Sequence, residues 1–234
     1  MPVLSFGSRT IAYDLRLSPR RSTVSITVDP ARGVVVAAPQ GVSSTVLESI
    51  LLRKAPWIIR KLREAPPAPQ PAPKEFVSGE SFPFLGRRYR LKVQGDGRLS
   101  VALRGDRLLV TLPEKDNASA VRAALVQWFE ERARERLPER VDLYSARMGV
   151  APSRVVVKHQ KRRWGSCARD GAIYLNWRII MAPLSVVDYL VVHELCHLKV
   201  RSHSQDFWHA VECVLPDQKQ RRDWLRRNGP FLIL

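Results

Sequence analysis

The stretch VVHELCHLKVRSHSQDFW, residues 191–208, holds three of the five histidines of the chain. His193 and His197 are four residues apart, so in a helix their side chains leave the same face one turn apart. Glu194 is the next residue around that helix, and the apolar residues before it predict a buried helix. This HExxH spacing is typical of a helix in which two imidazoles bind Zn²⁺ and the glutamate accepts a proton from the zinc-bound water. The alternative is that two histidines flank a glutamate by chance.

A catalytic zinc takes a third protein ligand and keeps one position open. His203 follows the HExxH segment, and Ser204 has the side chain of an N-cap for a further helix. The first helix must therefore end before His203, so that the chain turns back and His203 approaches the metal from another direction. We predict that His203 is the third ligand, with Asp206 and Glu212 as the competing candidates.

The helix that carries the histidines has a start signal of its own. Pro183 and Ser185, with Asp188 three residues after the serine, form a capping-box pattern that predicts where the helix begins. Cys196 lies inside the motif but leaves the helix in another direction from the two histidines, so we expect an inert buried thiol. We expect His159 and His209 to be packing or surface residues and not ligands.

The first half of the chain shows one pattern twice. Three runs rich in β-branched residues predict strands, and a proline and a tryptophan-bearing helix follow each set. The first set covers residues 9–17, 23–28 and 33–38, then Pro39 and a helix from Ser43 or Ser44 to about Arg63, which Pro56 should kink or divide. The second set covers residues 87–93, 98–103 and 107–112, then Pro113 and a helix from about Ala118 to Gly149. We infer a duplicated β-β-β-α unit, with a chance likeness between common hairpins as the alternative.

Residues 64–75, EAPPAPQPAPKE, are rich in proline. Such a run favours extended polyproline geometry and excludes a helix or a central strand. We therefore expect an α+β protein with a β-rich N-terminal unit that ends in a helix (1–63) and a Pro-rich linker (64–75). The remainder (76–234) joins the second β-β-β-α unit to the domain built around the HExxH helix.

A basic segment lies between two further predicted strands. Residues 155–159 and 172–177 flank KRRWGSCARDG, in which Asp170-Gly171 is a strong turn signal. If the edge of this hairpin lies above the metal, a peptide can add to it as another strand. Arg163 is our candidate for stabilising the developing oxyanion, and a solvated basic turn is the alternative.

Composition limits the class of protein. Lys and Arg outnumber Asp and Glu by 39 to 22, a net charge of +17, so the surface attracts polyanions and permits non-specific nucleic-acid contact. Three cysteines without CxxC spacing argue against a disulfide framework or a cysteine-built zinc site. No apolar run is long enough to span a membrane, and the N-terminus lacks a signal-peptide pattern. We expect a cytoplasmic protein without a membrane partner.

The segment HELCHLKVRSHSQDFW, with RRWGSCARDGAIYLNWRIIMAP before it and PDQKQRRDWLRRNG after it, resembles the YgjP-like family of zinc metallopeptidases, which is related to the SprT-type zincins. The resemblance covers about residues 150–229 closely and the first half in general pattern. It implies a zincin-like catalytic domain in which His193, His197 and His203 bind zinc and Glu194 is the base. The histidine spacing also equals that of metzincins, but Val200 stands where they have glycine, so their loop geometry is not carried over.

These patterns predict a zinc-dependent metallohydrolase, above all a metallopeptidase that acts on a peptide or protein through a Glu-activated zinc-bound water. The same chemistry and the basic surroundings also permit hydrolysis of nucleotide phosphoanhydrides. A third function is a nucleic-acid-associated protease, which the net charge suits. No helix-turn-helix, zinc-finger or aromatic RNA-binding motif accompanies that charge.

Overall fold

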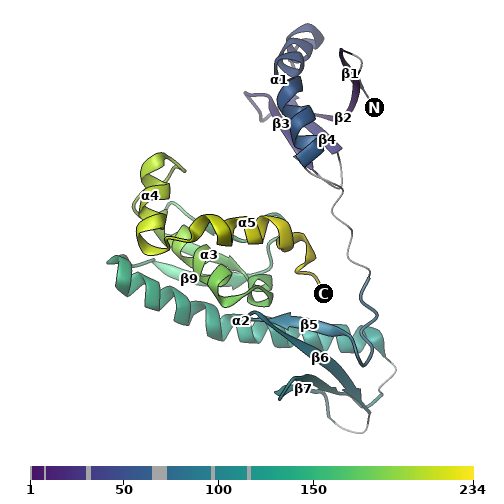
Figure 1. Ribbon diagram of the computed structural model, residues 1–234, viewed down its shortest axis with the longest axis vertical. Coiled ribbons are helices and arrows are strands. Elements are labelled where there is room, and N and C mark those ends of the chain that lie inside the picture. Colours follow the sequence, from purple (N-terminus) through teal and green to yellow (C-terminus); the bar gives the residue numbers. More distant parts are fainter. Residues whose placement is uncertain (1, 8, 30–32, 65–72, 96–97, 115–116) are drawn as a thin grey trace. The chain divides into compact units, whose positions relative to one another are not determined.

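The computed structural model describes residues 2–7, 9–29, 33–64, 73–95, 98–114 and 117–234 (Figure 1). The chain separates into two compact units, residues 1–71 and 72–234. Most of the predicted Pro-rich linker, residues 65–72, lies outside the described residues.

The first unit is a four-stranded sheet followed by a helix. Its elements are β1 (Val3–Phe6), β2 (Arg9–Ser18), β3 (Ser25–Asp29), β4 (Gly33–Pro39) and α1 (Ser44–Glu64). In the sheet order β1-β2-β4-β3, the central strands β2 and β4 are parallel and both outer pairs are antiparallel. Alternate residues of β4 and residues at helical spacing on α1 form one core. The core residues of these two elements are Val34, Val36, Ala38, Leu47, Leu51, Ala55 and Ile58.

The second unit begins with the same arrangement. Its first elements are β5 (Ser81–Phe84), β6 (Arg87–Gln94), β7 (Ser100–Arg104), β8 (Arg107–Thr111) and α2 (Ala118–Met148). The sheet order β5-β6-β8-β7 repeats the strand order and the pairing directions of the first sheet. The first hairpins also share their register, because Phe6 pairs with Arg9 and Phe84 pairs with Arg87. The predicted repeat is therefore present, but each copy starts with one more short strand, β1 or β5, which the sequence pattern missed.

The helix α2 has the ends that its sequence predicts. Asn117 caps it by accepting a hydrogen bond from the N–H of Ala120, and Gly149 ends it in the left-handed conformation at φ 59°. Pro138 lies within α2 and Pro56 within α1, and neither proline divides its helix. The helix α1 is therefore continuous through Pro56, so the expected division is wrong and the expected kink stays a prediction.

A three-stranded sheet follows α2. Its strands are β9 (Arg154–Lys158), β10 (Gly165–Cys167) and β11 (Ala172–Asn176), in the order β10-β11-β9. The two long strands predicted from the sequence, β9 and β11, pair in parallel. The antiparallel partner of β11 across the Asp170-Gly171 turn is β10, a short strand at the edge of the sheet. The short helix η1 (Trp177–Met181) leads from this sheet to the helix with the histidines.

Three helices complete the second unit: α3 (Leu184–Cys196), α4 (Gln205–Val214) and α5 (Gln218–Asn228), before the short η2 (Gly229–Phe231). The predicted capping box at the start of α3 is wrong, because the helix begins directly after Pro183 with no side-chain cap and Ser185 lies inside it. Asp188 is 7% exposed and accepts hydrogen bonds of 2.7 and 3.0 Å from the guanidinium of Arg140 on α2. This bidentate ion pair with another helix replaces the local cap because it is the stronger contact.

The helix α3 lies in the centre of the second unit. It packs against α2, α4, α5 and β10, and Val187, Val191 and Leu195 are completely buried. The mixture of sheets and helices confirms the α+β class. Among the described residues no helix has the length and apolar character that a membrane crossing requires.

Candidate metal centre

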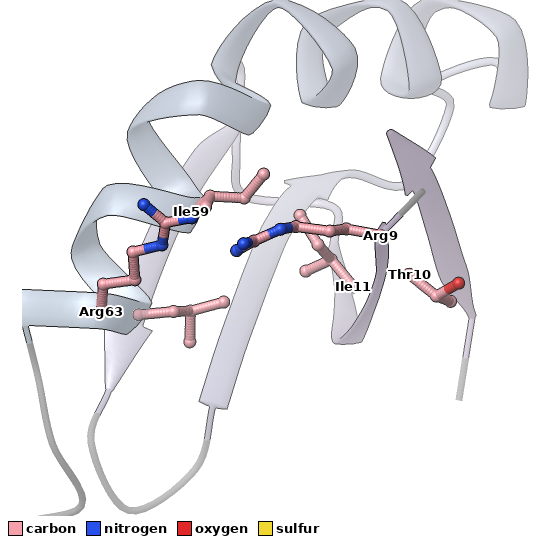
Figure 2. A pocket seen from close by; sticks show the side chains of 6 residues that line it. Arg9, Thr10, Ile11, Ile59 and Arg63 are labelled. Carbon is pink, nitrogen blue, oxygen red and sulfur yellow. The ribbon is translucent and has the colours of Figure 1, made fainter. Parts of the chain in front are cut away.

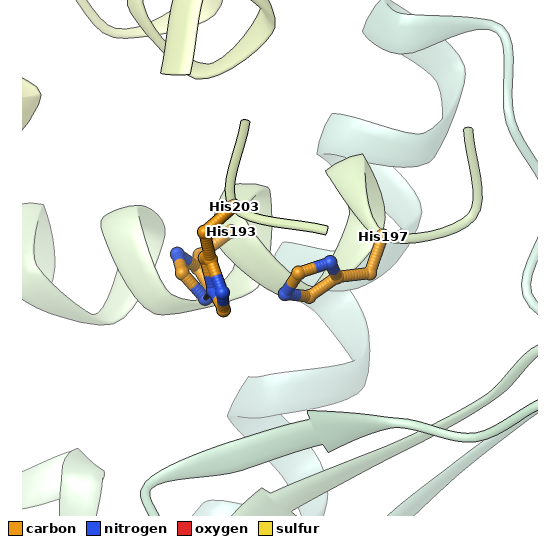
Figure 3. A group of neighbouring side chains, drawn as sticks. All are labelled: His193, His197 and His203. Carbon is orange, nitrogen blue, oxygen red and sulfur yellow. Dashed lines mark hydrogen bonds between the residues drawn. The ribbon is translucent and has the colours of Figure 1, made fainter. Parts of the chain in front are cut away.

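Three histidines meet at the C-terminal end of α3. His193 lies in the last turn of α3, His197 is its C-cap, and His203 lies in the loop before α4. Figure 3 shows the three imidazoles converging, and their candidate ligand nitrogens all lie within 4.8 Å of one another. The Nε2 atoms of His193 and His203 are 3.0 Å apart. In the described part of the chain this is the only such group of three or more potential ligands.

The turn after α3 orients one of these imidazoles. The backbone oxygen of Val200 lies 3.1 Å from Nδ1 of His197. Since a carbonyl oxygen only accepts, Nδ1 carries the proton and Nε2 keeps its lone pair for a ligand. Val200 is not among the residues with a positive φ, so this position does not require glycine.

Two long basic side chains anchor the loop that carries His203. The Nζ of Lys199 donates a 2.8 Å hydrogen bond to the carbonyl of Met148 at the end of α2. The guanidinium of Arg201 donates to the carbonyl of Ala168 at 2.7 Å and to a second carbonyl of the β10–β11 turn at 3.3 Å. The position of His203 therefore depends on contacts with α2 and with the β10–β11 hairpin.

The first turn of α4 packs against the imidazoles. Ser204 is its N-cap, as predicted, because its Oγ accepts a hydrogen bond from the N–H of Phe207. Phe207 is fully buried, and its ring lies 4.9, 4.5 and 4.8 Å from the rings of the three histidines in chain order. Trp208 stacks on His203 at 5.7 Å. These aromatic contacts fix the imidazole rings without engaging their nitrogens.

Burial lowers the pKa of two of the three histidines, His193 and His197. Burial is the largest cause that lowers the pKa of His193 to about 3, and repulsion by the neighbouring histidines and by Arg222 contributes to the same shift. Burial is also the main cause that lowers the pKa of His197. The Nδ1 of His193 is buried and has no hydrogen-bond partner among the residues that the structure describes. Neutral imidazoles with open nitrogens are the form that binds a metal ion.

The Glu194 side chain lies against the backbone of the edge strand β10. It is 4% exposed, and a Cβ added at Gly165 would lie 2.5 Å from its Oε1 and 2.8 Å from its Cγ. Real Cβ atoms do not approach other atoms so closely, so any side chain at Gly165 would displace the carboxylate. The glycine in β10 therefore provides the space that Glu194 occupies.

Burial also tunes the Glu194 carboxyl. It raises the pKa of Glu194 to about 7, while the positive charge of Arg163 opposes the rise. Arg163 is exposed, but its main chain is held in place because the Nδ2 of Asn176 donates to the carbonyls of Gln160 at 2.8 Å and of Arg163 at 3.1 Å. A carboxyl with a pKa near neutrality suits proton transfer at physiological pH.

The metallopeptidase-domain family called YgjP-like matches residues 22–228. The chain belongs to the YgjP-like family. The YgjP-like assignment supports a metal-dependent peptidase at the level of the family and implies peptide or protein substrates. No curated protein matches the chain.

Two solved structures resemble part of this YgjP-like chain. One is the metallopeptidase zymogen of Pyrococcus abyssi abylysin, with 25% identity and a TM-score of 0.35 over 37% of this chain and 89% of that one. The other is the metallopeptidase zymogen of Methanocaldococcus jannaschii jannalysin, with 16% identity and a TM-score of 0.34 over the same shares.

The competing ligand candidates lie outside the histidine cluster of this YgjP-like chain. Asp206 and Glu212 are not part of it. The carboxylate of Glu212 instead lies 3.6 Å from the Nζ of Lys219 on α5. His209 and His159 are likewise outside the cluster. Cys196 is buried, and burial raises the pKa of its thiol to about 11, so it stays protonated as expected of an inert thiol.

Two residues near the histidine cluster could not be assigned a firm role from the sequence. The guanidinium of Arg222 on α5 lies 4.6 Å from the ring of Trp208. The ring of Tyr189 lies 5.9 Å from that of His193, and burial raises the pKa of its hydroxyl to about 12. The four-residue spacing from Tyr189 to His193 was a usable signal, because it places both on one helix face. Arg222 had no such signal, since only the packing of α5 brings it near.

Proposed function

We propose that this YgjP-like chain is a zinc-dependent metallopeptidase in which His193, His197 and His203 bind the metal and Glu194 is the general base. The observation that carries the proposal is the meeting of three imidazoles beside one buried carboxylate. Three protein ligands with one position left open are the set that catalytic zinc uses.

Two further features support zinc at this site. The hydrogen bond from Nδ1 of His197 to a backbone carbonyl is the kind of contact that orients a ligating imidazole. The low pKa of His193 means that its imidazole is already neutral at neutral pH, so it loses no proton when it binds a metal ion. When bound, zinc supplies Lewis acidity, which lowers the pKa of a water molecule and polarises a carbonyl group.

Glu194 supplies the proton transfer. Its carboxylate takes a proton from the attacking water and returns it to the leaving amine of the cleaved peptide bond. The raised pKa strengthens the carboxylate as a base, and positive charge nearby, such as that of Arg163, keeps it ionised near neutral pH.

The edge strand β10 offers a place for the peptide. It has a neighbour on one side only within its sheet, and the backbone of Gly165 lies against the Glu194 side chain. A substrate that pairs with β10 as an added strand would bring its scissile carbonyl beside that carboxylate. Arg163, just before β10, is proposed to stabilise the oxyanion that develops on this carbonyl.

The test compares the wild-type protein with Glu194→Gln. Metal analysis gives the zinc content, and hydrolysis is followed on casein, a peptide panel and a nucleotide panel. Glutamine keeps the size of the side chain but cannot accept the proton, so zinc should remain while activity falls by about 10² to 10⁴. His209→Ala is the matched control and should keep both.

Two outcomes would contradict this proposal. One is a Glu194→Gln protein that retains its zinc and hydrolyses peptides at the wild-type rate. The other is turnover of nucleotides without any turnover of casein or peptides, which would assign the same metal site to phosphoanhydride hydrolysis.

A further inference from the structure

The first unit carries a groove between β2 and α1 (Figure 2). Its volume is about 330 Å³, and its lining residues are Arg9, Thr10, Ile11, Ile59, Leu62 and Arg63. Ile11 is buried and Ile59 half-buried, so the floor is apolar. Leu62 is 39% exposed, so part of this apolar surface is open to solvent.

Two guanidinium groups flank the apolar floor. Figure 2 shows Arg9 reaching from β2 toward α1, and Arg63 rising from α1 on the opposite wall. Neither guanidinium group has an ion-pair or hydrogen-bond partner within the described ranges. Two unpaired arginines beside aliphatic side chains suit a ligand that combines a carboxylate with an aliphatic group.

The repeated unit shows what the equivalent face does elsewhere in the chain. Counted from the first residue of each helix, Ile59 and Arg63 of α1 correspond to Ala133 and Leu137 of α2. Ala133 and Leu137 are completely buried in the second unit. The face that is an open groove in the first copy is therefore covered in the second.

A polypeptide segment packs on the helix and on one strand of the second copy. The short helix η1 packs against both α2 and β5. The N–H of Leu85, in the turn between β5 and β6, donates a 2.9 Å hydrogen bond to the carbonyl of Ile180 in η1. In its second copy, this sheet-and-helix unit therefore packs against a short, largely apolar stretch of chain through its helix and through β5, the strand that corresponds to β1.

We propose that the groove between β2 and α1 binds a short internal peptide segment in which an aliphatic residue neighbours an aspartate or glutamate. The aliphatic side chain lies on Ile11 and Ile59, and the carboxylate pairs with Arg9 and Arg63. The groove has no aromatic lining residue on which a base could stack, and a phosphate would leave the apolar floor unused. The observations therefore favour a peptide over a nucleic acid.

The experiment measures binding to the full-length chain. The probe is a short fluorescent peptide of alternating leucine and glutamate, acetylated and amidated at its ends. It is titrated by fluorescence anisotropy with Glu194→Gln protein that has been treated with a chelator, so that cleavage does not interfere. Because the readout is binding and not hydrolysis, its result stands apart from that of the proposed peptidase.

The decisive variant is Arg9→Glu combined with Arg63→Glu, and its matched control is Arg53→Glu combined with Lys54→Glu. Both doubles make the same change in charge, and all four side chains are exposed, but only the first pair lines the groove. We expect the groove variant to bind the probe at least about tenfold more weakly and the control to change the affinity by less than about twofold.

Two further arms complete the test. Replacing every glutamate of the probe by glutamine should weaken its binding to the unchanged groove by about the same factor as the groove variant does. Leu62→Ser should weaken the binding of the leucine-glutamate probe. Equal losses in both double variants would show that binding follows overall charge, and an unaffected groove variant would show binding elsewhere; either result would overturn the proposal.

Discussion

The two sheet-and-helix copies share strand order, pairing directions and core positions, yet only the second supports the candidate metal centre. Leu51 on α1 and Leu125 on α2 occupy the same place in their helices and are both buried. The copies differ in helix length, because α1 has 21 residues and α2 has 31. The repeated part builds a stable scaffold in each copy, and the added turns of α2 connect that scaffold to the histidine helix.

The added turns of α2 make specific contacts with the site. Arg140 holds Asp188 of α3 through two hydrogen bonds, and the carbonyl of Met148 accepts the bond from Lys199 in the turn after α3. α1 ends before the positions that correspond to these residues. The copy with the candidate metal centre thus differs from the other copy by a helix extension of about three turns.

The largest expected effect comes from removing a ligand, which should change the second unit and leave the first unchanged. His193→Ala should weaken zinc binding by at least about a thousandfold, because each nitrogen carries a large part of the binding free energy in a three-ligand site. A titration against a chromophoric chelator measures it, with His209→Ala as the control. Stoichiometric zinc in His203→Ala, together with loss of zinc in Glu212→Ala, would contradict the assignment of the third ligand.

The ion pair between α2 and α3 tests the role of the helix extension. Asp188→Asn leaves the half-buried guanidinium of Arg140 without its carboxylate, so we expect the second unit to lose about 2–3 kcal/mol in its free energy of unfolding. Urea unfolding followed by circular dichroism measures it. Glu130→Gln breaks an exposed pair with Arg134 on the same helix and should cost less than about 0.5 kcal/mol. Equal losses of unfolding free energy in the two variants would show that the helix extension has no special role.

Matched glycine substitutions compare the site with the scaffold of the first unit. At Gly165 an added methyl group meets the Glu194 carboxylate, whereas at Gly41 in the first unit it meets nothing within 4 Å. We expect Gly165→Ala to lower kcat by about tenfold or more while zinc content stays the same, because the base is displaced and the ligands are not. Gly41→Ala should change neither quantity. An unchanged kcat in Gly165→Ala would show that the position of Glu194 does not limit the reaction.

The smallest expected effect concerns the charge of Arg163. This charge lowers the pKa of Glu194, so its removal in Arg163→Gln raises that pKa and a higher pH is needed to ionise the base. The acid limb of the pH profile of kcat/KM should therefore move to higher pH. The move should be less than about one pH unit, since Arg163 is exposed and solvent screens its charge. Arg162→Gln is the control at the neighbouring residue. An equal shift of the acid limb in that variant would show that Arg163 has no specific effect.

Local sequence signals predicted much of the fold because their causes lie within a few residues. The helix end at Gly149 follows from the backbone freedom of glycine, and the cap at Ser204 follows from its own hydroxyl. The capping box at Ser185 failed because Asp188 pairs with Arg140, a residue 48 positions earlier in the chain. The short strands β1 and β5 were missed because four residues carry too little of an alternating pattern to stand out.

The sequence by itself determined the repeated sheet-and-helix pattern and the chemistry of the HExxH residues, since helical periodicity places His193 and His197 on one face. The sequence predicted His203 beside them, but only the tertiary structure shows the contacts of Arg201 and Phe207 that hold it there. The tertiary structure also placed Gly165 against Glu194 and the charge of Arg222 near His193. The physical reason is the distance along the chain over which each interaction acts. Helix period and capping act within one or two turns, whereas burial and charge depend on which distant segments pack together, and these set the pKa of each group in the site.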